Sequence, residues 1–238
     1  MPGCPTRPAG IHYDVDVSSS PRPPRIAVLG SGRVGSTLAR LAVQAGYDVT
    51  IAASGDPAAI ALIVEIVVPG ARAAWAVDAV RDADLVVLAV PLHRFGTVDP
   101  AMLAGRTVID VMNYWAPVDG VQQAFEDSAL TSSEVVQRRL AGARVVKAFN
   151  HIGYHEVEEH RLPAGAEGRQ ALGVAGDDAG ARAAVAELIE RIGYDVVDLG
   201  ALAEGRPLQP GGPCFGARLT AREFDRVLGR GAGLPARA

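Results

Sequence analysis

The sequence predicts an α/β protein of the Rossmann type, with a doubly wound, mostly parallel sheet of about eight strands and helices on both faces. Short apolar, β-branched runs alternate with helical patterns along the chain. Most central runs are continuously apolar, which is typical of parallel strands that are covered on both faces. A glycine-rich turn, GSGRVG, joins the first apolar run to the first helical pattern. Together these observations favour a nucleotide-binding sheet.

Eight apolar runs are predicted to be strands, and most are bounded by glycine, proline or charged residues. They are Arg25–Gly30, Asp48–Ala53, Ala74–Val77, Leu85–Val90, Thr107–Val111, Arg144–Phe149, Gln170–Ala175 and Asp195–Asp198.

The intervening segments are predicted to be helices where apolar residues recur at helical spacing. The first helix places five residues on one face and ends at Gly46; the five are Val34, Leu38, Leu41, Ala42 and Ala45. We expect Pro57–Val68 to be helical because Asp56 and Pro57 form a good N-terminal pair. A further helix is expected over Ala179–Ile192, and Tyr114–Thr131 is expected to be mostly loop.

The chain is expected to form one main domain with two extensions. Residues 1–24, rich in proline and serine, read as a disordered tail, 25–210 as the Rossmann domain, and 211–238 as a partly helical C-terminal extension. After the last strand only about 40 residues remain, and GRPLQPGGP cannot form a long helix. A long helical C-terminal domain is therefore not expected, so a second ligand must bind against the same domain.

The composition of the chain argues against nucleic acid and membranes as binding partners. The 23 Lys and Arg residues are balanced by 27 Asp and Glu residues with no basic run, which argues against nucleic acid. The longest apolar segment, from Ala58 to Val68, is interrupted by Glu65 and is too short to span a membrane. Two cysteines, Cys4 and Cys214, fit a reducing, cytoplasmic compartment. A homodimer through the sheet edge or the C-terminal edge is the default expectation for association.

The glycine-rich turn is the strongest binding signal. Gly30, Gly32 and Gly35 follow a strand and open a helix, which is the arrangement that brings backbone amides to the pyrophosphate of a dinucleotide. We expect the whole turn to contact the cofactor: Gly30, Ser31, Gly32, Arg33, Val34 and Gly35.

The end of the second strand predicts NADP(H) rather than NAD(H). An acid that would hold the ribose hydroxyls of NAD is absent from the positions Ala52 to Gly55. Ser54 can donate a hydrogen bond to a 2′-phosphate, and Arg33 either assists or is an ordinary surface arginine. Asp56 is better interpreted as the N-cap of the next helix.

The fourth strand ends at the expected cofactor crevice. Ala89, Val90 and Pro91 are predicted to lie along the nicotinamide ribose, because Pro91 fixes the turn there. His93 either contacts the cofactor or is a plain surface histidine.

Several longer stretches make the chain resemble the NADPH-dependent coenzyme F-420 reductases, whose fold also occurs in the oxidoreductase domain of the STEAP metalloreductases. Besides GSGRVG, the resemblance covers roughly residues 25–210 and rests on VIDVMNYWAP, SSEVVQRRLAGARVVKAFNHIG, GVAGDD and GYDVVDLGALAEGRPLQP.

This resemblance implies hydride exchange between NADPH and an 8-hydroxy-5-deazaflavin, coenzyme F-420. It implies a second-ligand cleft beside the nicotinamide that is formed by Met112, Asn113, Asn150, His151 and Ile152. For Asn150, a helix-capping role remains the alternative. No catalytic acid or base is expected, because two stacked rings need positioning and the cofactors carry the chemistry.

Alternatives remain open for function and for the histidines. The acceptor could instead be a flavin, an imine or a small carbonyl compound, or the protein could bind NADP(H) without turnover. His151, His155 and His160 invite a metal interpretation, but the spacing of the last two breaks the HExxH pattern, so no metal is expected.

Overall fold

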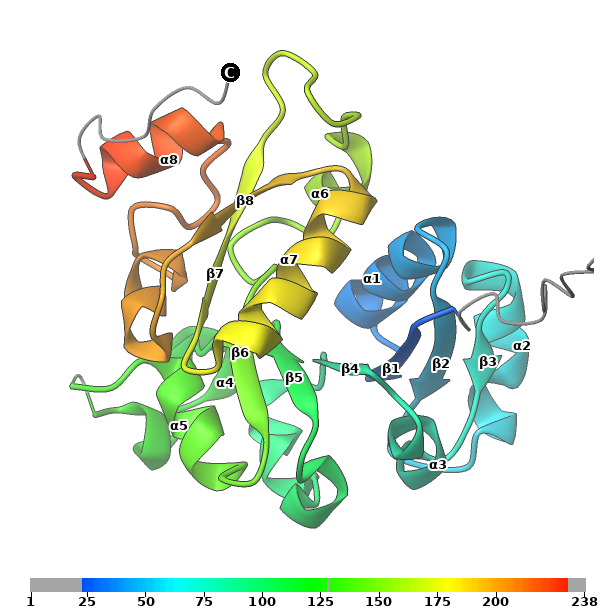
Figure 1. The fold of residues 1–238 in the computed structure, drawn as a ribbon. Coiled ribbons are helices and arrows are strands. Elements are labelled where there is room, and N and C mark those ends of the chain that lie inside the picture. Colours follow the sequence, from blue (N-terminus) through cyan, green and yellow to red (C-terminus); the bar gives the residue numbers. More distant parts are fainter. Residues whose placement is uncertain (1–22, 128, 231–238) are drawn as a thin grey trace, which may run out of the picture.

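The structure, a computed structural model, describes residues 23–127 and 129–230. One eight-stranded sheet has the order β3-β2-β1-β4-β5-β6-β7-β8 (Figure 1). Neighbouring strands are parallel except for β6 and β7. The strands are β1 (Arg25–Leu29), β2 (Asp48–Ala52), β3 (Arg72–Ala73), β4 (Leu85–Leu88), β5 (Thr107–Asp110), β6 (Arg144–Lys147), β7 (Ala171–Gly176) and β8 (Asp195–Asp198). The predicted mostly parallel sheet is confirmed.

Helices cover both faces of this sheet, as predicted. They are α1 (Arg33–Gln44), α2 (Ala58–Val67), α3 (Ala76–Arg81), α4 (Ala116–Asp119), α5 (Ser132–Arg139), α6 (Glu156–Glu159), α7 (Ala179–Ile192) and α8 (Ala221–Val227). None of the helices that the structure describes is long and apolar enough to cross a membrane.

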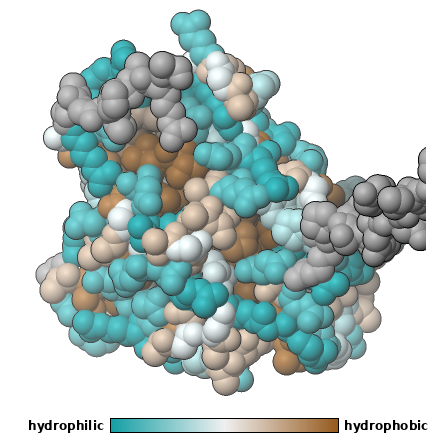
Figure 2. Space-filling view, viewed as in Figure 1, coloured by the Kyte–Doolittle hydropathy of each residue, from teal (hydrophilic) through white to brown (hydrophobic). Residues whose placement is uncertain are grey.

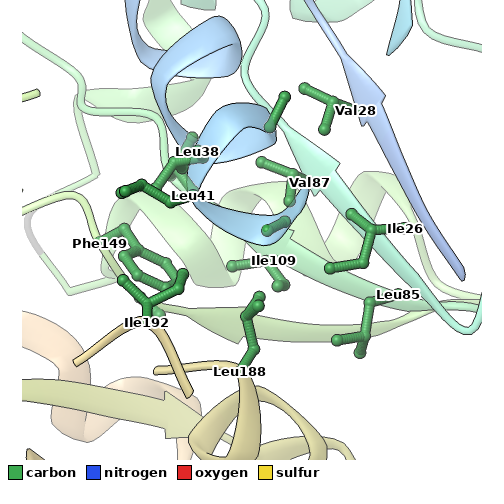
Figure 3. Packing of buried hydrophobic residues seen from close by; sticks show 14 of the residues in the cluster. Ile26, Val28, Leu38, Leu41, Leu85, Val87, Ile109, Phe149, Leu188 and Ile192 are labelled. Carbon is green, nitrogen blue, oxygen red and sulfur yellow. The ribbon is translucent and has the colours of Figure 1, made fainter. Parts of the chain in front are cut away.

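Alternation along each strand divides the core into two layers. In β1, Ile26 and Val28 point to one face and Ala27 and Leu29 to the other, since successive side chains of a strand alternate. Figure 3 shows the first layer, in which side chains from β1, β4 and β5 meet those of α1 and α7. The second layer packs the sheet against α3 and α5. Burial on both faces explains why the strands read as continuous apolar runs.

The end of the chain packs on β7 and β8 rather than forming a separate unit. Leu208, Cys214 and Phe224 are buried against the two strands. Helix α8 begins with a capping box in which Thr220 and Glu223 satisfy each other's backbone amides. Of the expected tail 1–24, residues 1–22 lie outside the described part of the chain, as do the final residues 231–238 of the expected C-terminal extension.

The predicted third strand, Ala74–Val77, is wrong. β3 ends at Ala73, and α3 begins at Ala76. Asp78 in the first helical turn forms an ion pair with Arg81 at 2.6 Å, three residues later, and that spacing suits a helix. The apolar residues of this segment therefore belong partly to an edge strand and partly to the buried face of a short helix.

Two predicted helices are confirmed by the structure. The predicted α7 agrees with the observed Ala179–Ile192, and Gly193 follows it with a φ of 120°. Helix α2 lies within the predicted Pro57–Val68, and the Asp56 carboxylate accepts a hydrogen bond from the Ala58 amide at 2.8 Å. In the described residues of the segment Tyr114–Thr131, the structure has the short helix α4 and one 3-10 turn, in line with the expected loop.

Candidate functional site

The turn between β1 and α1 is held by contacts that leave no room for a side chain at two of its glycines. A Cβ at Gly30, whose φ is 120°, would overlap the carbonyl group of Ala89 at the end of β4. A Cβ at Gly35 would overlap the carbonyl oxygen of Gly30. Helix α1 therefore starts directly against the carboxyl edge of the sheet. It starts between β1 and β4, where the strand order reverses direction.

Gly32 is different, because a Cβ there would have no protein atom within 4 Å. Gly32 precedes α1, whose N-terminus has no side-chain cap and no acidic residue in its first turn. Uncapped N–H groups and the positive end of the helix dipole form a site for a phosphate group. These residues fit the diphosphate of a dinucleotide, and the free space at Gly32 is where it would approach the backbone.

The end of β2 lies beside this turn, since the amide of Gly30 donates to the carbonyl of Ala52 at 2.8 Å. Ser54 follows and is exposed. Asp56 is engaged with the Ala58 amide. The positions that would contact the ribose of a bound dinucleotide therefore offer a free hydroxyl, while the nearest carboxylate is committed to capping α2.

The end of β4 supplies backbone rather than side chains to the crevice. Ala89 and Val90 are half-buried and lie against Gly30, whereas Pro91 and His93 are exposed. After Pro91 the chain makes a 3-10 turn from Leu92 to Thr97.

A pocket of about 330 Å³ opens beside the glycine-rich turn. Helix α1, the segments that follow β5 and β6, and the C-terminal extension form its walls. Its lining is Val34, Leu38, Val111, Asn113, Phe149, Asn150, His151, Ile152, Gly153, Tyr154, Glu156, Val157, Phe215 and Gly216. Four of the five predicted cleft residues, all except Met112, thus meet in one place, and Val34 connects this pocket to the glycine-rich turn.

The two asparagines of this pocket bind each other. The Asn150 side-chain amide donates to Asn113 Oδ1 at 3.0 Å and to the Leu208 carbonyl at 2.6 Å. Asn113 Nδ2 in turn donates to the Asn150 carbonyl at 2.7 Å. Both N–H groups of the buried Asn150 are used, so the half-buried Asn113 is the amide with a donor left for a ligand. The capping alternative for Asn150 does not hold, because α6 begins after His155.

His151 is a fixed, neutral part of the wall. Its Nε2 accepts a hydrogen bond from the Gly173 amide at 3.2 Å, so the proton lies on Nδ1, 3.5 Å from Asn150 Oδ1. Burial, with a smaller effect of Lys147, lowers the pKa of His151 to about 3. The described residues contain no group of three or more His, Cys, Asp and Glu side chains that could hold a metal ion.

A buried ion pair lies beneath the cleft. Lys147 Nζ is 3.4 Å from Asp110 Oδ2, and Ser133 donates to the same oxygen at 2.6 Å. Asp110 Oδ1 accepts from the Met112 amide, while Lys147 donates to the Met112 carbonyl. The ion pair thus binds both the amide and the carbonyl of Met112, and it fixes the backbone directly before Asn113. Burial lowers the pKa of Lys147, and Asp110 opposes that effect.

The side chain of Met112 points away from the pocket. It is buried in the second core layer, against residues from β4 and β5. Its predicted place in the cleft is therefore filled by its neighbour Val111, and Met112 acts through its backbone.

Phe149 forms a strained corner of the pocket. It is the one described residue other than glycine with a positive φ, 61°. Its ring is buried beside Leu41 and Ile192 (Figure 3). A non-glycine residue keeps this conformation where packing overdetermines it, and such residues cluster at functional sites.

Arg33 reaches toward the mouth of the pocket. Its guanidinium donates to the Tyr154 hydroxyl at 3.1 Å and lies 5.9 Å from the centre of that ring. Arg33 therefore joins the glycine-rich turn to the segment after β6. Its expected role beside Ser54 stays a prediction, with an ordinary surface arginine as the alternative.

Several lining residues escaped the sequence analysis for identifiable reasons. Leu38 was counted only as a core position of the first helix, and Phe149 only as the end of a strand. Phe215 and Gly216 carry no local signal, because their place depends on the extension folding back, with the Gly216 amide bound to the His151 carbonyl at 2.8 Å.

Comparison with known proteins gives one family match over part of the chain and several similar structures that cover about three quarters of it or more. Residues 25–114 match the family described as NADP oxidoreductase, coenzyme F420-dependent. A hypothetical protein from Sinorhizobium meliloti has a similar structure, with 30% identity and a TM-score of 0.69 over 83% of this chain and 95% of that one. A protein from Arthrobacter sp. FB24, described as a candidate F420-dependent NADP reductase, is 29% identical, with a TM-score of 0.64 over 76% and 86% of the two chains.

An animal protein is also similar to this chain in sequence. The metalloreductase STEAP3 of Rattus norvegicus is 25% identical over 189 residues, which are 78% of this chain. The chain spans 36% of the length of that relative.

The different surroundings of Gly32 and Gly35 predict different effects of substitution. Gly32→Val should weaken NADPH binding by about 100-fold or more, because the side chain fills the approach to the backbone, yet change the free energy of unfolding by less than about 0.5 kcal/mol. Gly35→Ala should lower the free energy of unfolding by about 1–3 kcal/mol through overpacking. Calorimetry and urea unfolding measure the two effects; equal destabilisation by both variants would contradict the assignment.

The neutral, buried His151 predicts a pH dependence of stability. Its folded pKa lies below its ordinary value near 6.5, so the unfolded chain takes up a proton first as the pH falls. His151 therefore lowers the free energy of unfolding between about pH 6.5 and pH 3, by up to about 1.4 kcal/mol per pH unit. Urea unfolding at several pH values should show a shallower dependence for His151→Asn and the wild-type dependence for the exposed control His93→Asn. Equal slopes for all three proteins would refute this.

Proposed function

We propose that this chain, whose residues 25–114 match the family of coenzyme F420-dependent NADP oxidoreductases, transfers hydride between NADP(H) and a deazaflavin held in the pocket beside α1. The similarities support an NADP(H)-dependent oxidoreductase, and the deazaflavin as its partner is the finer part of the proposal. The observation that carries it is the position of the pocket, which adjoins the glycine-rich turn through Val34.

The pocket suits a planar ring system. Its volume of about 330 Å³ is within the range of small-molecule sites, and its walls include Val34, Leu38, Val111, Phe149 and Ile152. Apolar walls exclude water from two stacked rings. Bound nicotinamide supplies the hydride and the deazaflavin accepts it, so the protein has to provide distance and orientation.

Asn113 is the residue we assign to orientation. Its free N–H can donate to a ring carbonyl, and its position is set by Asn150 and, through Met112, by the ion pair of Asp110 and Lys147. His151 and Ile152 form the adjoining wall. Because His151 is neutral and already bonded, it orients Asn150 and does not exchange protons.

For the cofactor we assign Gly30 to Gly35 to the diphosphate, Ser54 to the 2′-phosphate, and the backbone of Ala89, Val90 and Pro91 to the nicotinamide ribose. His93 is exposed beyond this turn and would contact the cofactor from its rim. The uncapped start of α1 and the free space at Gly32 support the first assignment.

The acceptor can be identified by spectroscopy. Mixing the protein with NADPH and the deazaflavin should bleach the deazaflavin absorbance as NADPH is oxidised in equal amounts. Asn113→Ala should lower kcat/KM by about 10-fold or more through the lost hydrogen bond, whereas Gln122→Ala, which lies outside the pocket lining, should not. If the deazaflavin spectrum stays unchanged while a flavin, an imine or a carbonyl compound consumes NADPH, the proposed acceptor is wrong.

The cofactor preference depends on Ser54. Ser54→Asp places a carboxylate beside the 2′-phosphate, so NADPH affinity should fall by about 10-fold or more while NADH affinity is maintained or rises. Titration of the fluorescence of each reduced cofactor measures the two affinities. Unchanged NADPH affinity in Ser54→Asp would place the 2′-phosphate elsewhere.

A further inference from the structure

The chain after β8 returns to the pocket beside α1. It forms the 3-10 helix Leu202–Leu208 and then an irregular segment, residues 209–220, that leads into α8. We call residues 209–220 the C-terminal connection. In Figure 1 this orange part of the chain lies beside β7 and β8. Two of its residues, Phe215 and Gly216, line the pocket together with residues of α1 and of the turn after β6.

Hydrogen bonds hold the C-terminal connection against two other parts of the fold. The Gly216 amide donates to the His151 carbonyl in the pocket wall at 2.8 Å. Further along, the Leu219 carbonyl accepts from the amide of Ala171, the first residue of β7, at 2.8 Å. The connection is therefore tied both to the pocket and to the sheet, so its position is set before any ligand binds.

The residue before Phe215 is buried, and this fixes where Phe215 lies. Cys214 has no exposed surface and packs in the same apolar cluster as Phe224. Its amide donates to the Pro207 carbonyl at 3.1 Å, and the Phe215 amide donates to the Gly212 carbonyl at 3.1 Å. Phe215 thus starts from an anchored backbone, and a ligand that contacts it does not have to order the chain first.

The side chain of Phe215 takes no part in the core. It is half-buried, yet it belongs to none of the three apolar clusters that the described residues form. In the view of Figure 2, hydrophobic residues occupy a few areas on a surface that is otherwise largely hydrophilic. An aromatic ring stabilises a fold most when it is buried in the core, so a ring kept in the wall of a pocket indicates a role in binding.

The other aromatic rings of the lining are already engaged. Phe149 is packed in the first core layer, and His151 is fixed through its Nε2 atom. The ring of Tyr154 lies 4.0 Å from the ring of His155, centre to centre. Phe215 has no ring or cation partner among the described residues. It is therefore the aromatic face of the pocket that remains for a ligand.

We propose that Phe215 selects the second ligand of the pocket by stacking against a flat, fused aromatic ring system. This inference rests on the proposed function, because it concerns the hydride acceptor of that same pocket. A fused ring presents a face that pairs with the ring of Phe215 in an offset or edge-on arrangement. A small aliphatic imine or carbonyl compound has no such face. Val34 and Ile152 offer apolar contact to either class, so the discrimination depends on Phe215.

The position of Phe215 in the chain separates acceptor selection from cofactor binding. The glycine-rich turn lies within residues 25–114, which match the family of oxidoreductases, whereas Phe215 lies outside them. The two segments meet at the pocket, to which the turn contributes Val34. A change at Phe215 should therefore alter the affinity for the acceptor and leave the affinity for NADPH as it is.

The test measures binding of oxidised 8-hydroxy-5-deazariboflavin to the full-length chain saturated with NADP⁺, so that no hydride is available. Difference absorbance gives the dissociation constant. Phe215→Ala should raise this constant by about 10-fold or more, because the stacking surface is lost. Phe215→Leu keeps apolar bulk without a flat face and should raise it by about 3-fold or more. Phe215→Trp should stay within about 3-fold of the wild type.

Two controls separate ligand binding from folding. Since Phe215 lies outside the core clusters, its variants should keep the wild-type temperature of thermal unfolding and the wild-type affinity for NADPH. Trp75→Ala removes an aromatic ring that is 50% exposed and outside the pocket lining, and it should leave the affinity for the deazaflavin unchanged.

The outcomes distinguish this inference from the proposed function. A deazaflavin that does not bind the wild type, or that binds Phe215→Leu as tightly as the wild type, would overturn the inference. Displacement of the bound deazaflavin by an equal concentration of pyrroline, a small aliphatic imine, would do the same. Binding that depends on Phe215 without hydride transfer from NADPH would leave the inference standing and refute the proposed function.

Discussion

The close approach of backbone to backbone at the start of α1 is the constraint on which the site depends. Gly30 lies against Ala89 and Gly35 against Gly30, so the helix meets the carboxyl edge of the sheet without an intervening side chain. This contact aims the uncapped N-terminus of α1 at the crevice, and it brings Val34 to the wall of the adjoining pocket. One packing requirement thereby sets the position of the proposed dinucleotide site relative to the adjoining pocket.

The opposite wall depends on buried polar contacts. Asp110 and Lys147 are the last residues of two neighbouring strands, and together they hold the backbone of Met112. Asn113 and Asn150 then hydrogen-bond to each other, and His151 Nδ1 lies 3.5 Å from Asn150 Oδ1. A buried ion pair is poor evidence of stability in itself, but here it fixes the geometry of a turn that lines the pocket.

The sequence predicted what depends on local pattern. Apolar runs located seven of the eight strands, and the glycine spacing located the start of α1. The third strand failed because two residues of edge strand and a short helix share one apolar run, so periodicity could not divide them. In the site, the segment after β6 was predicted through resemblance, whereas Lys147 was counted only as part of the predicted strand Arg144–Phe149 and Phe215 had no signal at all. Both depend on contacts distant in sequence, namely 37 residues for Lys147 and Asp110, which no local pattern encodes.

Binding of NADP(H) is proposed to depend on the amides from Ser31 to Gly35, which would hold its diphosphate. Titration of the ¹⁵N-labelled protein with NADPH, followed by amide chemical shifts, measures this contact residue by residue. The largest shifts should fall on these amides and extend to Asn113 and Ile152 in the adjoining pocket. Saturable binding that leaves the amides of residues 31–35 unperturbed would show that the diphosphate binds elsewhere.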